Sequence, residues 1–191
     1  MVSDATHRHK PIPSRPKTGW QAWESTTGYI ASHYNPDATL KIEIYPINEV
    51  VGWAATFSWG QHQESVRDHM SFGEALSALW LQIESYHPSL MEAPEARTRR
   101  PISYGDEDWL DQMTLDVFSR LVGVTEMAFG GQWQLVIVYR PAENPADRVQ
   151  TRLIAQNGNA TIGARGATLR DACRALFTSA AVRFRQFVLK L

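Results

Sequence analysis

The sequence predicts an α+β protein made of two tandem (α)-β-β-β-α units, whose mainly antiparallel sheets pack into one pseudo-symmetric core. Three observations lead to this prediction: runs of alternating apolar and polar residues, amphipathic runs that begin at capping residues, and a second half that repeats the order and spacing of the first. We expect a disordered tail over residues 1–18, a first unit over 19–90, a linker over 91–105 and a second unit over 106–191.

The first unit carries the clearest strand patterns. Residues 40–44 (LKIEI) and 53–59 (WAATFSW) alternate with a period of two, as strands with one buried face do. A weaker third strand is expected over residues 64–70. Apolar spacing over residues 20–34 fits a helix before these strands, and a helix that starts after Ser71 closes the unit.

The second unit shows the same order. An acidic segment at residues 106–111 favours a helix start, because negative charge stabilises the positive end of a helix dipole, and Gly123 is expected to end that helix. Three strands follow, over residues 135–139, 149–155 and 160–165. Thr168 then caps a C-terminal helix whose apolar stripe reaches Leu191. Residues 135–139 (LVIVY) have no polar side, which predicts a central strand covered on both faces.

The two halves agree in spacing as well as in order. Three pairs of segments align at offsets that grow by one residue per connection: 40–46 with 135–141 at 95, 53–57 with 149–153 at 96, and 71–80 with 168–177 at 97. In the last pair, SFGEALSALW and TLRDACRALF, a hydroxyl residue is followed three positions later by an acid, the spacing of a capping box. The matches indicate a duplication; the alternative is that unrelated helices share ordinary helix-start chemistry.

Composition limits the class of protein. The chain has 191 residues, 43% of them hydrophobic, and a formal net charge of −1, so it can form a sizeable core and has no global charge that would attract nucleic acid or an anionic membrane. The single cysteine, Cys173, excludes an intramolecular disulfide and is expected in the core. No apolar run approaches the roughly 18 residues that cross a membrane, and no secretory signal is visible, so we expect a cytoplasmic protein.

The order of elements in each half resembles that of the double-stranded RNA-binding domain, in which a helix, three antiparallel strands and a second helix follow one another. The resemblance covers the topology alone. Those domains carry a lysine-rich start to the last helix, which grips phosphates. Here residues 71–74 (SFGE) contain no base and residues 168–171 (TLRD) contain only Arg170, so the resemblance does not by itself imply RNA binding.

Basic residues gather near the C-terminal helix and in the linker. Seven of them are candidate contacts for an anion or a nucleic acid: Arg165, Arg170, Arg174, Arg185, Arg97, Arg99 and Arg100. The alternative is ordinary surface charge that complements the helix dipole and the acidic segment at residues 106–111.

An aromatic strand supplies the second candidate surface. Trp53, Phe57 and Trp59 share one strand face, and they form either the core of the first unit or, if that face is uncovered, an interface or ligand surface. Our favoured hypothesis is a non-enzymatic binding or scaffold protein that self-associates as a homodimer. The alternative is a nucleic-acid-binding module that uses the basic residues of the C-terminal helix and the linker.

No catalytic, metal-binding or cofactor-binding motif stands out. The sequence contains no HExxH, GxSxG, P-loop or dinucleotide-binding pattern, so we assign no catalytic residue, no metal and no cofactor. An enzyme is a third hypothesis, and it would require His62 and His69 to converge on one site.

Overall fold

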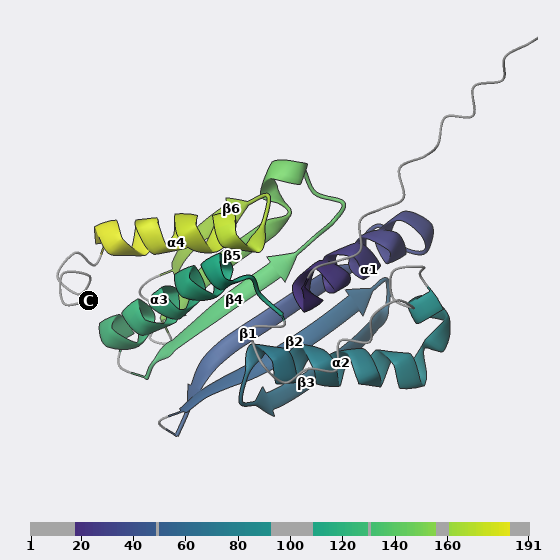
Figure 1. Ribbon diagram of the computed structural model, residues 1–191, viewed down its shortest axis with the longest axis horizontal. Coiled ribbons are helices and arrows are strands. Elements are labelled where there is room, and N and C mark those ends of the chain that lie inside the picture. The colour runs from purple at the N-terminus through teal and green to yellow at the C-terminus, as the bar shows by residue number, and fades with distance from the viewer. Residues whose placement is uncertain (1–17, 49, 93–108, 130, 156–160, 184–191) are drawn as a thin grey trace, which may run out of the picture.

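The structure is a computed structural model of the chain, and the residues it describes are 18–48, 50–92, 109–129, 131–155 and 161–183 (Figure 1). These residues form four α-helices and one six-stranded antiparallel sheet, which confirms the α+β class. In chain order the helices and strands are α1 (Gly19–His33), β1 (Thr39–Ile47), β2 (Val50–Trp59), β3 (His62–His69), α2 (Phe72–Tyr86), η1 (Pro88–Glu92), α3 (Gln112–Phe129), β4 (Trp133–Tyr139), η4 (Pro145–Asp147), β5 (Val149–Ala155), β6 (Thr161–Gly166) and α4 (Leu169–Arg183).

The six strands form one continuous sheet in the order β3-β2-β1-β4-β5-β6, and every neighbouring pair is antiparallel. Strands β1–β3 and β4–β6 therefore join edge to edge, with β1 and β4 at the centre. In this central pair Ile42 lies opposite Ile137, and Ile44 lies opposite Leu135. All four side chains are buried, so the join between the two halves is part of the hydrophobic core.

All four α-helices pack on the same face of the sheet (Figure 1). The ring of Trp23 in α1 lies 5.8 Å from that of Phe57 in β2. At the other end of the sheet, the hydroxyl of Thr151 in β5 donates a hydrogen bond of 3.2 Å to the backbone carbonyl of Ala172 in α4. The same face carries Trp53, which contacts both α2 and α3. The protein is therefore a two-layer structure, one layer of helices on one sheet.

Strand β4 is central, as predicted, but the described helices cover only one of its faces. Its residues alternate between buried and half-buried along the whole strand. The half-buried positions include Val136 and Val138, which point away from the helix layer. The expectation that helices or sheets would cover both faces is wrong for the described residues, because both halves of the chain place their helices on the same side.

The aromatic residues of β2 belong to the core. Trp53, Phe57 and Trp59 are 7%, 0% and 7% exposed. The ring of Trp53 lies 5.8 Å from Phe72 of α2 and 5.5 Å from Phe118 of α3. Of the two alternatives for this strand face, the structure shows the core: helices cover the side on which an interface or ligand surface was considered.

Helix α3 starts later than its sequence predicts. The acidic segment 106–111 was expected to open it. Residues 106–108 lie outside the described residues, and the helix is capped by Asp111. The carboxylate of Asp111 accepts hydrogen bonds from the backbone N–H and the hydroxyl of Thr114, both at 3.0 Å. Asp111 thus acts as the N-cap, and the first helical residue is Gln112.

Helix α3 also ends later than predicted. It passes through Gly123 and continues to Phe129, so the predicted stop at Gly123 is wrong. The buried stripe explains the difference, because Val124 and Thr125 are 1% and 0% exposed and pack beneath the helix. Burial of these side chains outweighs the low helix propensity of a single glycine.

Several predicted segments fall outside the described residues. These are nearly all of the tail over 1–18, the linker beyond its first two positions and the C-terminal helix beyond Arg183. The start of the predicted linker is occupied by η1, which follows directly on the C-cap of α2 at His87.

The position of Gly123 generates a first prediction. A Cβ atom at this residue would meet no atom within 4 Å, and glycine costs a helix interior about 0.5–1 kcal/mol relative to alanine. We expect Gly123→Ala to raise the free energy of unfolding, measured by urea titration, by that amount. The matched control is Gly166→Ala, which should destabilise the protein because its Cβ would lie 2.5 Å from the backbone nitrogen of Ala172. Equal effects of the two substitutions would contradict this packing.

Candidate functional site

The sheet face turned away from the helices is called the open face below, because no described helix packs on it. One row of directly paired residues crosses all six strands on this face: Ser65, Thr56, Lys41, Val138, Gln150 and Arg165. Five of these six side chains are polar or charged. This row is therefore mainly hydrophilic, with Val138 as its one apolar member, whereas the helix-covered face is mainly apolar and aromatic.

Among the described residues, five cationic side chains lie on the open face: Lys41, Arg67, Arg140, Arg152 and Arg165. Lys41 is paired, with its Nζ 3.0 Å from the carboxylate of Glu43. Arg140 donates a hydrogen bond of 3.5 Å to Oε1 of Gln150, and its Nη1 lies 4.0 Å from a carboxylate oxygen of Glu143. The other three arginines have no hydrogen-bond or ion-pair partner among the described side chains, so their guanidinium groups are available to an external anion.

A shallow hollow of about 390 Å³ lies in the open face, over β1–β4. The hydroxyl groups of Thr56, Ser58 and Ser65 line it, together with the cationic groups of Lys41 and Arg67. Hydroxyl groups can donate to an oxygen anion, and the cations attract it. The carboxylate of Glu43 also lines the hollow and pairs with Lys41, so Arg67 is the lining cation that has no partner among the described side chains and could pair with a phosphate or sulfate group.

The unpaired arginines are far apart across the sheet. Arg67 is on edge strand β3, whereas Arg152 and Arg165 are on β5 and β6 at the opposite edge. Neighbouring strands are about 4.8 Å apart, so four or five strand spacings separate the two ends by roughly 20 Å. A single small anion cannot reach both ends, but an extended polyanion can.

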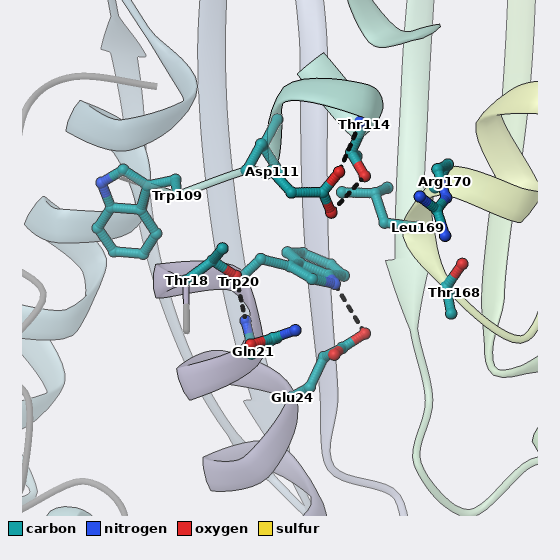
Figure 2. A pocket seen from close by; sticks show the side chains of 11 residues that line it. Thr18, Trp20, Gln21, Glu24, Trp109, Asp111, Thr114, Thr168, Leu169 and Arg170 are labelled. Carbon is teal, nitrogen blue, oxygen red and sulfur yellow. Dashed lines mark hydrogen bonds between the residues drawn. The ribbon is translucent and has the colours of Figure 1, made fainter. Parts of the chain in front are cut away.

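A second hollow lies on the helix side, where α1, α3 and α4 begin (Figure 2). It has a volume of about 160 Å³. Thr18, Asp111 and Thr168 each cap the helix that follows them. Arg170, a predicted anion contact, lines this hollow and reaches Sδ of Met113 at 3.4 Å. Because the helix starts already have their own caps, one of them a carboxylate, we infer no anion site at this point.

Glu24 of α1 forms part of the wall of this hollow (Figure 2). The indole Nε1 of Trp20 donates a hydrogen bond of 2.7 Å to its Oε1. Burial raises the pKa of Glu24 above the ordinary 4.5, although the hydrogen bond from Trp20 and the charge of Arg148 act in the opposite direction. This carboxyl group therefore keeps its proton to a higher pH than an exposed glutamate does.

The structure separates basic residues that the sequence grouped together. Arg165 lies on the open face, whereas Arg170 and Arg174 lie on α4, on the other side of the sheet. The remaining candidates fall outside the described residues: Arg97, Arg99, Arg100 and Arg185. The predicted cluster is thus not one surface in the described part of the chain.

Four basic residues of the open face were missed by the sequence analysis: Lys41, Arg67, Arg140 and Arg152. A signal for them exists in the alternation of the strands. Arg152, for example, lies between buried Thr151 and Leu153 and must point to the other face. Alternation assigns residues of different strands to a common face only when the pairing of those strands is known.

The two histidines required by the enzyme hypothesis do not converge. His62 and His69 begin and end β3, and seven steps along a strand span about 23 Å. His62 instead stacks on Trp59 with ring centroids 5.5 Å apart. Within the described ranges, no group of three or more His, Cys, Asp or Glu residues is placed to hold a metal ion. Cys173 is buried, and burial raises the pKa of its thiol to about 12.

None of the described helices is long and apolar enough to span a membrane. No protein-family model matches the chain, and no curated protein matches its sequence.

The environment of Glu24 generates a prediction of pH dependence. Because its pKa is raised in the folded protein, the folded state binds this proton more tightly than the unfolded state does. The contribution to stability is present at low pH, and it is lost as the pH rises from 4.5 through the folded pKa. We expect the free energy of unfolding of the wild type to fall across that window relative to Glu24→Gln, which cannot titrate. Parallel stability curves from urea titrations between acid and neutral pH would contradict the assignment.

Proposed function

We propose that the protein binds nucleic acid through the open face, mainly by contacts to phosphates. The observation that carries the proposal is the set of three arginines without partners in the described structure, Arg67 at one edge of the sheet and Arg152 and Arg165 at the other. Phosphate contacts supply most of the affinity of a protein for nucleic acid irrespective of sequence. Arginines spaced across about 20 Å suit a charged chain better than a small ligand.

The distribution of charge supports this proposal. The net charge of the chain is only −1, yet the described part of the open face has five cations against three carboxylates: Glu43, Asp68 and Glu143, the last paired with Arg140. The described α-helices carry six acidic residues against four arginines, so the excess of negative charge lies on the helix side; the acids are Glu24, Glu74, Glu84, Asp116, Glu126 and Asp171, and the arginines are Arg120, Arg170, Arg174 and Arg183. Such a separation of charge gives the molecule a positive side, which would turn toward a polyanion as the two approach.

The side chains between the cations favour binding that does not depend on sequence. Hydroxyl groups such as those of Thr56 and Ser65 can contact phosphate or sugar oxygens. Tyr45 is the one aromatic residue among the described side chains of this face, and its hydroxyl donates to Asp68 at 3.1 Å. Stacking of bases on aromatic rings is therefore not the expected source of affinity.

The proposed nucleic-acid contacts thus lie on the sheet, whereas the hypothesis from the sequence placed them on the C-terminal helix and the linker. The self-association that we favoured from the sequence rested on an uncovered aromatic face, and Trp53, Phe57 and Trp59 are buried. The two sheet edges offer little support for it either, since β3 has a bulge and charged residues and β6 is short. A homodimer therefore stays a prediction from the sequence, and sedimentation of the intact chain can test it.

We further propose that the two halves arose by duplication and are related by a twofold pseudo-symmetry. Ile42 pairs with Ile137, and these two residues are equivalent at the offset of 95 that aligns their strands. A twofold axis through this pair would exchange the halves. The two flanking pairs also exchange with each other at the same offset: Leu40–Tyr139 and Ile44–Leu135.

The outer elements support the same relation. Ala55 and Thr151 face the two members of the central pair, which reproduces the offset of 96 between β2 and β5. The hydroxyls of Ser71 and Thr168, at an offset of 97, each accept a hydrogen bond from the backbone N–H three residues later, at 3.1 and 3.2 Å. Matching registers and caps are more than shared helix-start chemistry alone would produce.

Paired substitutions test the binding proposal. Arg152→Gln with Arg165→Gln removes two cations from the open face, and Arg174→Gln with Arg183→Gln removes two exposed cations from α4 as the matched control. We expect the wild type and the control to bind a fluorescent single-stranded oligonucleotide with an affinity that falls as salt rises from about 50 to about 200 mM. The open-face variant should bind more weakly, and its slope of log affinity against log salt should be smaller by about 1.4.

Fluorescence anisotropy measures both quantities. The absence of binding by the wild type at low salt would overturn the proposal. Equal losses in the open-face and α4 variants would show that net charge, and not the open face, determines the affinity.

A further inference from the structure

A groove distinct from the two hollows described above lies on the helix side of the protein, between α1 and the segment that joins β4 to β5. Its volume is about 580 Å³, within the range of pockets that hold small molecules. Five of its lining residues carry the argument: Glu24, Ser25, Gly28, Tyr139 and Arg148. Gly28 helps to form the gap, because the nearest atom to a Cβ at this position would be in Pro141, 4.0 Å away.

Arg148 is the first unusual feature of this groove. The residue is half-buried, and its Nε is sealed from solvent without a hydrogen-bond partner. No described carboxylate lies within ion-pair distance of its guanidinium group, although the charge of Arg148 acts to lower the pKa of both Glu24 and Tyr139. A partly desolvated guanidinium is costly to leave unpaired, so the groove presents a cation that lacks its anion.

Glu24 is the second feature. It lines this groove as well as the hollow at the helix starts. The charge of Arg148 acts to lower the pKa of Glu24, although the two groups form no ion pair. Trp20 occupies Oε1 of Glu24 through its indole N–H, which fixes the carboxyl group in place. The groove therefore holds one cationic and one acidic group at separate positions on its wall.

Neutral hydrogen-bonding groups complete the lining. The hydroxyl of Ser25 has no partner among the described residues, and that of Tyr139 lies at the long distance of 3.5 Å from the backbone carbonyl of Glu24. Both hydroxyls are thus free to rearrange around a bound polar molecule.

We propose that this groove binds a small zwitterion of the α-amino-acid class, whose carboxylate pairs with Arg148 and whose ammonium group pairs with Glu24. At a pH at which Glu24 is ionised, a ligand with both charges satisfies both wall groups and enters without net charge, whereas a simple anion would be repelled by Glu24. The proposal is independent of the nucleic-acid function, because the groove lies on the helix side and shares none of these residues with the open face.

The test is isothermal titration of the intact protein with each of the common α-amino acids at up to about 10 mM, a concentration at which weak binding is measurable. We expect at least one of them to bind. The N-acetyl derivative of that amino acid, which has no ammonium group, should bind roughly tenfold more weakly or worse, and so should its methyl ester, which has no carboxylate.

Variants locate the site. Glu24→Gln and Arg148→Gln should each weaken binding by roughly tenfold or more, whereas Arg152→Gln on the open face should have no effect. Arg148→Lys keeps the positive charge but not the planar guanidinium group, and it serves as a second variant in case Arg148→Gln does not fold. Circular dichroism of every variant checks the fold. The proposal is overturned if no amino acid binds, if the N-acetyl derivative binds as well as the free amino acid, or if the groove variants bind like the wild type.

Discussion

The antiparallel pairing of β1 with β4 is the contact on which the rest of the architecture depends. It joins two three-stranded sheets edge to edge, and its buried pair of Ile42 and Ile137 belongs to the core of both. Because each half carries its helices on the same face, the pairing places all four helices in one layer. The other side of the sheet is then left free of described helices. If the halves had stacked face to face, this surface would have been buried.

The two faces of the joined sheet have different chemistry as a consequence. Aromatic and aliphatic side chains face the helices, where Trp53 and Phe57 form ring contacts in the core. Hydroxyl, amide and cationic side chains occupy the open face, where Arg152 and Arg165 have no partners in the described structure. On the helix side there are two separate hollows, one where α1, α3 and α4 begin and the other the groove beside Arg148. The polymer site and the small-molecule site that we propose thus lie on opposite sides of one sheet.

Much of the fold could be predicted from the sequence, since alternation and capping are local signals. Ser71 and Thr168 cap their helices as expected, and the strand patterns around Ile42 and Arg152 correspond to real strands. The helix stop at Gly123 was wrong because the tertiary burial of the residues after it is not a local property. The site was harder to predict. Arg165 and Arg170 are five residues apart but lie on opposite sides of the sheet, and only strand pairing unites Arg67 with Arg152 on one face.

We propose that nucleic acid binds to the open face, the side of the sheet that the pairing of β1 with β4 leaves free of described helices. The most direct measurement is a nuclear magnetic resonance titration of the ¹⁵N-labelled intact chain with a short single-stranded oligonucleotide. If the oligonucleotide binds to the open face, chemical shifts will change at strand amides and arginine Nε signals of that face, including those of Arg67, Arg152 and Arg165. The signals of the exposed face of α4 will not change. Changes confined to Arg170, Arg174 and the rest of α4 would contradict this proposal.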